Sequence, residues 1–196
     1  FRYKHHSLVA FYLEESHKNA IQALEEHQEG VMLSASVISL IFSCLAMEAF
    51  LNEMASRVLD DSEIELFAFC RGEFKKKKNE SALKAKFRHL LNRKFEAGLD
   101  SGLGECIDEL SHLRNALVHY KITEHATKYK VKAPKAPLGV IVADFQAPVE
   151  LVQESFLKRI TADAAVKGFN SVRDAINFWG RHEGIEDSTP GFERIA

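Results

Sequence analysis

The sequence predicts an all-α fold: a helical bundle of four main helices with an additional short helix and an extended arm. Apolar residues recur at the period of a helix through most of the chain. Three of the four prolines lie in one stretch, 121–160. A chain of 196 residues with 46% hydrophobic and 28% charged residues suits one globular core. We therefore predict a single domain over residues 1–184 and a loose tail over residues 185–196.

The first two helices are predicted at residues 8–28 and 31–58, with Gly30 between them. One small or apolar stripe follows the first helix: Val9, Leu13, Ser16, Ala20, Ala23 and Leu24. The stretch 30–47 carries no charge over 18 residues, which is the lower limit for a helix that spans a membrane. It contains four serines and no basic flank or aromatic belt, which favours a central helix buried on all sides. No membrane contact is therefore expected.

A short helix and a basic loop are predicted next. Ser62 and Glu65 have the spacing of a capping box, and they predict a short helix that ends at Phe69. Residues 71–79 are predicted to form the loop. The following helix is predicted at 80–97, and its buried face consists of Leu83, Phe87, Leu90 and Leu91.

Gly98 is expected to end that helix, and residues 99–104, which contain two further glycines, are expected to form a turn. The next helix is predicted at 105–120, with Ile107, Leu110, Leu113 and Leu117 facing inward. The extended arm, 121–160, includes a β-branched run at 140–142 that favours a small strand pair. A connection of this length is typical of a lid or a contact arm.

The last helix is predicted to begin at Thr161 or Asp163, either of which can cap it. Its inward face repeats at helical spacing: Ala165, Phe169, Val172, Ile176 and Trp179. Gly184 is expected to end the helix and to begin the tail.

The candidate functional residues lie in the sequence R-N-A-L-V-H, residues 114–119. Asn115 and His119 are four residues apart and share one face of the predicted helix. His112 lies on that face one turn earlier. Arg114 points about 100° away from Asn115, but its long side chain can fold toward the end of the helix. These polar residues can therefore line a cleft while the apolar stripe anchors the helix.

This motif resembles the R-N-x-x-x-H signature of HEPN domains, a family of helical bundles. Residues 113–121, with Tyr120 among them, are similar to the longer form L-R-N-x-L-V-H-Y-K of that signature. Residues 48–53 read E-A-F-L-N-E and resemble the acidic E-A-F-x-N-E segment of several HEPN families. That segment supplies Glu48 and Asn52. The resemblance therefore involves two separate segments of the chain.

The resemblance covers about residues 8–121 and implies a metal-independent endoribonuclease whose catalytic residues are Arg114, Asn115 and His119. The supporting residues would be Glu48, Asn52, His112 and Tyr120. Many such domains work as homodimers with both motifs facing one groove, as toxins or anti-phage effectors. Others have lost catalysis and bind a nucleotide or a partner protein. If the protein is a toxin, an antitoxin or a regulatory protein is a further possible partner.

The residue types suit RNA cleavage by the RNA's own 2′-OH. His119 can act as base or acid near neutral pH. Arg114 offers a fixed fork of donors to phosphate oxygens, and Asn115 can position an oxygen or orient His119. A simpler interpretation stays open: Arg114 pairs with a helix acid, and His119 favours the negative end of its helix. Glu48 is expected either to be buried against Arg114 or to be exposed.

A basic segment, residues 71–94, contains ten Lys or Arg and two Glu, a net charge of +8 in a chain whose net charge is -2. The residues expected to contact the RNA backbone are Lys75, Lys76, Lys77, Lys78 and Arg88. The alternative is a solvated loop and helix face.

Other chemistries lack their motifs. The three cysteines are scattered and form no C-x-x-C pair, and the histidines lack the spacing of zinc ligands. Phosphate-binding glycine loops and nucleophile elbows are also missing from the sequence. We expect no metal and no cofactor, and scattered thiols fit a cytoplasmic protein. The functions that stay open are a ribonuclease, a non-catalytic binding module and a structural bundle without a polar site.

Overall fold

The computed structural model describes residues 7–26, 34–118 and 159–196, and these residues form an all-helical structure without strands. The helices are α1 (Leu8–Glu25), α2 (Ser34–Val58), α3 (Asp61–Ala68), the 3-10 helix η1 (Gly72–Phe74), α4 (Ala82–Phe95), α5 (Ser101–Val118) and α6 (Ala162–His182). The predicted all-α class is confirmed. The described residues form five helices of 14 to 25 residues and one α-helix of eight. The predicted bundle had four main helices, which is one fewer than the structure has.

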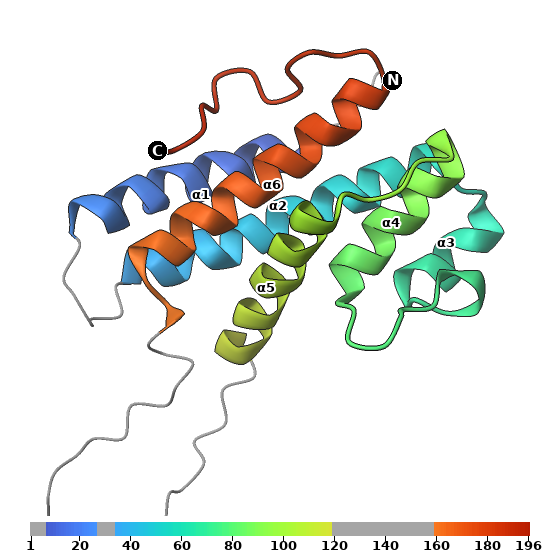
Figure 1. Ribbon diagram of the computed structural model, residues 1–196, viewed down its shortest axis with the longest axis horizontal. Coiled ribbons are helices and arrows are strands. Elements are labelled where there is room, and N and C mark those ends of the chain that lie inside the picture. Colours follow the sequence, from blue (N-terminus) through green and yellow to red (C-terminus); the bar gives the residue numbers. More distant parts are fainter. Residues whose placement is uncertain (1–6, 27–33, 119–158) are drawn as a thin grey trace, which may run out of the picture.

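Helix α2 is the centre of the bundle. It contacts α1, α6, α4, α5 and α3, and in Figure 1 it runs alongside α1 and α6 while α5 crosses it. Leu40, Met47 and Leu51 on α2 are fully buried. The absence of charge in the first half of α2 follows from this position, because neighbours cover it on several sides.

The serines of α2 join it to α1. Ser16 of α1 lies 2.6 Å from the hydroxyl of Ser43, and the hydroxyl of Ser39 donates to the Ser16 carbonyl at 3.0 Å. By length and composition α2 could cross a membrane, but 56% of its most apolar window is buried inside the bundle. This arrangement is compatible with a soluble protein.

Three helix starts differ from the prediction. Helix α4 begins at Ala82 instead of residue 80, because the Ser81 hydroxyl caps it, and it ends at Phe95, before the expected terminator Gly98. Helix α3 begins after Asp60, whose N–H donates to the Glu63 carboxylate at 2.9 Å, so the cap lies two residues earlier than Ser62. Helix α5 begins at Ser101 instead of residue 105, because the Asp100 carboxylate accepts from the Leu103 N–H at 2.9 Å. The expected turn over 99–104 is therefore mostly helix.

A close approach explains why α5 contains a glycine in its first turn. A Cβ atom at Gly104 would lie 3.0 Å from Cε of Lys84 on α4. The glycine makes room for the lysine side chain, and it does not break the helix. Helix α6 begins as predicted, with the Thr161 hydroxyl accepting from the Ala164 N–H at 3.1 Å.

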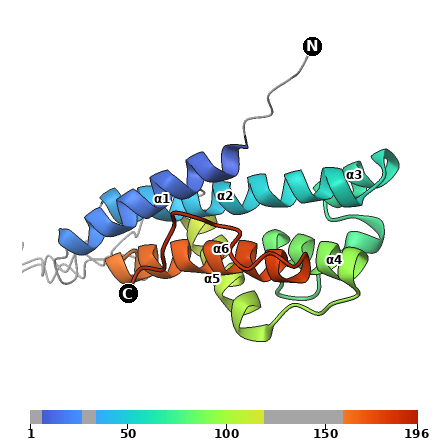
Figure 2. The ribbon, with the colours of Figure 1, turned by 90° about the horizontal axis from the view of Figure 1, so that it is seen from above.

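The C-terminal tail is bound along α6 instead of lying loose (Figure 2). The side chain of Asn170 donates to the Ile195 carbonyl at 2.9 Å and accepts from the Ile195 N–H at 3.1 Å. Asn177 makes a similar pair of bonds, to the Thr189 hydroxyl at 2.8 Å and from the Ser188 N–H at 2.7 Å. Side-chain amides on α6 thus replace the backbone partners that the tail lacks.

Most of the predicted arm, including the strand pair expected at 140–142, lies outside the described residues. Its last two residues are described. Ile160 is fully buried, and Arg159 forms an ion pair with Glu109 of α5 at 3.5 Å. The entry into α6 is therefore anchored on the bundle.

Candidate functional site

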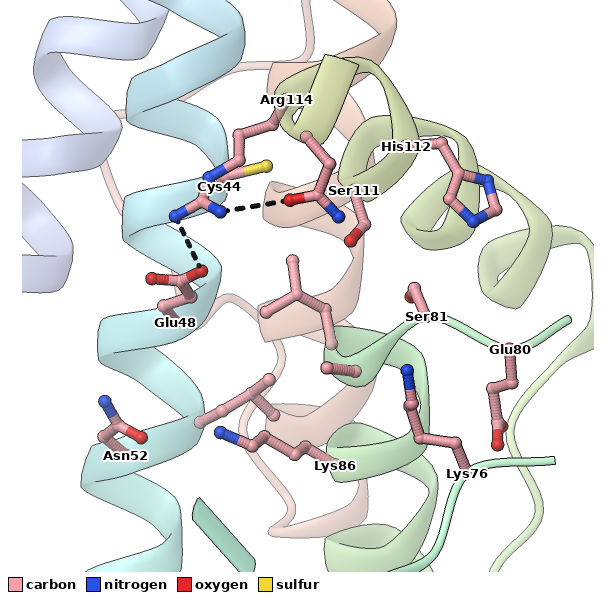
Figure 3. A pocket seen from close by; sticks show the side chains of 14 residues that line it. Cys44, Glu48, Asn52, Lys76, Glu80, Ser81, Lys86, Ser111, His112 and Arg114 are labelled. Atoms are coloured by element: carbon pink, nitrogen blue, oxygen red, sulfur yellow. Dashed lines mark hydrogen bonds and ion pairs between the residues drawn. The ribbon is translucent and has the colours of Figure 1, made fainter. Parts of the chain in front are cut away.

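A pocket of about 280 Å³ lies between α2, the segment that leads into α4, and the last turns of α5. Figure 3 shows side chains from these three places converging on it. Six residues that the sequence singled out line it: Glu48, Asn52, Lys76, His112, Arg114 and Asn115. The two segments that resemble HEPN domains, 48–53 and 113–121, therefore meet at one site, although they lie far apart in the sequence.

Arg114 connects the two segments. Its Nη2 atom lies 3.5 Å from Oε1 of Glu48, and its Nη1 atom donates to Oδ1 of Asn115 at 3.1 Å. The Arg114 side chain is 28% exposed and the Glu48 side chain is 40% exposed. Glu48 thus pairs with Arg114, as one of the two predicted alternatives had it, but its side chain is partly exposed instead of buried. This pairing also satisfies the simpler interpretation, in which Arg114 neutralises an acid on a neighbouring helix.

Cys44 forms part of the pocket wall, one turn before Glu48 on α2. Its sulfur lies 3.7 Å from the Leu110 carbonyl, to which the thiol donates. Burial, with a further contribution from Glu48, raises the pKa of the Cys44 thiol to about 12, and the nearby Arg114 offsets this only in part. The group therefore stays a protonated thiol at neutral pH and is unsuited to nucleophilic chemistry.

The floor of the pocket is fixed by ion pairs at the start of α4. The Glu80 carboxylate accepts two hydrogen bonds of 2.9 Å from Arg88 and one of 2.8 Å from the Lys77 N–H. The hydrogen bond from Arg88 lowers the pKa of Glu80, against the opposing effect of burial. Arg88, expected to contact RNA, is instead occupied by Glu80, because this buried carboxylate needs a cationic partner.

A second carboxylate holds the start of α4 against α5. Asp108 accepts from the Ser81 N–H and from the Lys84 ammonium, both at 2.8 Å. Burial would raise the pKa of Asp108, but its hydrogen bonds from Lys84 and Ser81 lower it overall. The two helices that frame the pocket are thus joined by a charged contact.

The four lysines of the basic run, residues 75–78, lie in different places on the surface. Lys76 lines the pocket that contains Arg114, whereas Lys77 and Lys78 line another hollow, beyond Glu80. Lys75 is exposed and lies outside the lining of both. The structure therefore brings one of the four lysines together with the predicted catalytic residues.

Two of the candidate residues, His119 and Tyr120, lie outside the described residues. Helix α5 ends at Val118, directly before His119. His112 is described: it is exposed and lies at the edge of the pocket beside Ser111 (Figure 3).

Several other residues line the pocket without having been predicted as site residues, among them Cys44, Lys86 and Ser111. Cys44 lies four residues before Glu48, and Ser111 lies four residues before Asn115, so the helical period places each on a face already of interest. That spacing could have predicted both residues as part of the site. Nothing in the sequence distinguished Lys86, because it is one of ten basic residues in its segment.

Within the residues that the structure describes, no group of three His, Cys, Asp or Glu side chains could hold a metal ion. Comparisons of the chain with protein-family models, with curated proteins and with solved structures give no match.

Proposed function

We propose that the chain is a metal-independent endoribonuclease of the HEPN type. The observation that carries this proposal is the ion pair between Arg114 and Glu48, which joins the R-N-x-x-x-H-like segment to the E-A-F-x-N-E-like segment at one open pocket. Two amide side chains, Asn52 and Asn115, line the same solvent-accessible pocket. A few polar groups that converge on a pocket are typical of a binding site, and the stability of the bundle does not require them.

The proposed reaction needs no metal-activated water, because the nucleophile belongs to the RNA. The 2′-OH oxygen attacks the adjacent phosphorus and gives its proton to a base. The bond from phosphorus to the 5′-oxygen breaks, and that oxygen takes a proton from an acid. The products are a 2′,3′-cyclic phosphate and a 5′-hydroxyl. His119 has the pKa range for either proton transfer near neutral pH.

Arg114 would stabilise the negative charge that grows on the phosphorane oxygens. Its guanidinium has five N–H donors, and the contacts to Glu48 and Asn115 involve only its two terminal nitrogens. Glu48 would act as a positioning residue that holds Arg114 toward the pocket. Asn115 would align a phosphate or sugar oxygen, and Tyr120 and His112 would support the site.

The working unit would be a homodimer. One Arg114, Asn115 and His119 set offers a single group that titrates near neutral pH, while the reaction needs both a base and an acid. A two-fold axis beside the motif would supply a second His119 and a second Arg114. An RNA-cleaving dimer of this kind in the cytoplasm would act as a toxin or a defence effector, restrained by an antitoxin or a regulatory protein.

A second function, a non-catalytic module that binds a nucleotide or a partner protein, is favoured by one observation. Glu48 already neutralises Arg114 in the structure, and a polar pocket of about 280 Å³ would suit a small ligand. The two functions differ in a simple respect: only the ribonuclease converts RNA into shorter products.

The test of the proposed function is a cleavage assay on total RNA and tRNA with matched variants. Arg114→Ala and His119→Ala should each abolish cleavage, and Asn115→Ala should weaken it less. Arg57→Ala is the matched control, because Arg57 is an exposed arginine at the end of α2. All variants should keep the wild-type helical circular dichroism signal. Cleavage that persists in Arg114→Ala and His119→Ala would contradict the proposal.

A further inference from the structure

Two lysine ammonium groups face the pocket and have no carboxylate partner in the part of the chain that the structure describes. Lys76 lies in the segment before α4, and Lys86 lies on α4 itself. The ion pairs of the described residues involve neither of them. Figure 3 shows the Lys76 side chain rising toward the cavity and the Lys86 side chain extending toward α2. Unneutralised cations beside a hollow attract an anion.

The position of Lys86 is restrained. Its ammonium lies 5.3 Å from the centre of the Phe67 ring, which is 1% exposed. Contact with the face of a fixed aromatic ring stabilises a cation and orders its side chain. The charge is therefore presented from a defined place, unlike that of a freely moving surface lysine.

Ser111 adds a hydrogen-bond donor from the opposite wall. The residue is 6% exposed, and its side chain lines the pocket. In Figure 3 this hydroxyl points into the pocket, between Arg114 and the lysines. A serine hydroxyl that faces a pocket can donate a hydrogen bond to an oxygen of a bound group.

We propose that Lys76, Lys86 and Ser111 form a second phosphate subsite, which binds the RNA phosphate next to the scissile one. The inference rests on the proposed function, which assigns the scissile phosphate to Arg114. Two ammonium groups and a hydroxyl from different elements line this pocket, and each of them can donate to the oxygens of a phosphate. The three residues act in positioning: they hold the strand and take no part in proton transfer.

A subsite at Lys76 and Lys86 differs from binding by the net charge of the whole basic segment. Lys75 and Lys78 belong to the same run but lie outside the lining of this pocket. If the whole segment attracted RNA only through its net charge, each of its exposed lysines would contribute equally. A built subsite instead requires Lys76 and Lys86 to contribute more than their neighbours.

The experiment measures binding of a labelled 2′-O-methyl oligoribonucleotide, which lacks the attacking hydroxyl and cannot be cleaved. The variant Lys76→Ala/Lys86→Ala should bind about tenfold more weakly, and the slope of log affinity against log salt should fall by about one. Ser111→Ala should weaken binding about threefold. The matched control Lys18→Ala/Arg57→Ala removes two exposed cations elsewhere and should change affinity less than twofold. Lys86→Gln keeps the stem over Phe67, so its effect separates loss of charge from loss of packing.

With a cleavable RNA, the double variant should raise KM and leave kcat close to wild type. The inference is overturned if Lys75→Ala/Lys78→Ala loses as much affinity as Lys76→Ala/Lys86→Ala, or if wild-type protein does not bind the oligonucleotide. Failure of the proposed function has a different signature. If RNA binding depends on Lys76 and Lys86 but the wild-type protein cleaves no RNA, the subsite is supported and the proposed ribonuclease function is contradicted.

Discussion

The proposed chemistry depends most closely on the contact between Arg114 and Glu48. Both side chains are partly exposed, and such ion pairs contribute about 0–1 kcal/mol to stability. Because the ion pair contributes little to stability, we infer that its main effect is on the geometry and charge of the pocket. Glu48 fixes the direction of the guanidinium, and it also places a negative charge where an RNA phosphate would approach.

Glu48→Gln tests this double role, because glutamine keeps an acceptor for Arg114 and removes the charge. We expect the free energy of unfolding to change by less than about 1 kcal/mol. Affinity for the 2′-O-methyl oligonucleotide should rise about threefold, since one repulsive charge leaves the pocket. Glu65→Gln, at an exposed site on α3, is the matched control and should leave affinity unchanged. Equal gains in both variants would contradict a local role for Glu48.

Glu80 should make stability depend on pH. Its pKa is lowered in the folded protein by the hydrogen bond from Arg88, so its contribution is present above the unfolded value of about 4.3. The contribution is lost as the pH falls through the lower folded pKa. Glu80→Gln should therefore destabilise the protein by about 2 kcal/mol at pH 7. Urea unfolding should show the gap to wild type closing from about pH 5 to pH 3.

The control for that experiment is again Glu65→Gln, whose unfolding free energy should differ from wild type by less than about 0.5 kcal/mol at every pH. A gap between Glu80→Gln and wild type that stays constant down to pH 3 would mean that the ion pair with Arg88 does not produce the effect.

At the scale of the elements, helical periodicity predicted which segments are helices, but local hydrogen bonds decided where they begin. Asp60 and Ser62 were both possible caps for α3, and Asp60 is the cap because the Glu63 carboxylate accepts its N–H. Glycines at 102 and 104 suggested a turn, yet α5 includes them. The Asp100 carboxylate caps the helix before both glycines, and Gly104 leaves room for Lys84 of α4. Periodicity along one helix contains no information on such a contact with another helix.

The tail is the element for which the sequence analysis was wrong, and Gly180 tests its attachment. A Cβ atom at Gly180 would overlap with Oγ of Ser188 and lie 2.8 Å from Cβ of the same residue. Gly180→Ala should therefore displace the tail, although alanine favours a helix by about 1 kcal/mol. Limited proteolysis should cut residues 185–196 faster in this variant than in wild type. Gly98→Ala, where nothing lies within 4 Å of the added atom, should be cut at the wild-type rate.

Part of the site could be predicted from the sequence because its residues repeat at helical spacing. Arg114 and Asn115 follow the apolar stripe of α5, and Glu48 follows that of α2. The proximity of Lys86 and Ser111 could not be predicted, because it depends on how α4 packs against α5. Asp108 fixes that packing by an ion pair with Lys84 and a hydrogen bond from the Ser81 N–H, and no periodic signal reveals these contacts.

At the scale of the whole molecule, the proposed dimer has a testable surface. Val118, the last residue of α5, is 53% exposed and directly precedes His119. A two-fold axis beside the motif would bury this side chain against its counterpart. Val118→Ser should therefore shift the protein toward monomer in sedimentation at micromolar concentration, and it should reduce cleavage.

Phe69→Ser is the matched control, because Phe69 is 63% exposed at the end of α3, and its substitution should leave the dimer intact. A wild-type protein that is monomeric at every concentration and still cleaves RNA would exclude the dimer.

The central claim is that the pocket at Arg114 serves RNA cleavage by the RNA's own hydroxyl. The most direct measurement is incubation of the purified protein with total RNA and tRNA in excess EDTA, followed by analysis of the product ends. The account predicts that cleavage persists, that the ends are 2′,3′-cyclic phosphates and 5′-hydroxyls, and that His119→Ala produces neither. Products with 5′-phosphates, loss of cleavage in the chelator, or an active His119→Ala variant would contradict it.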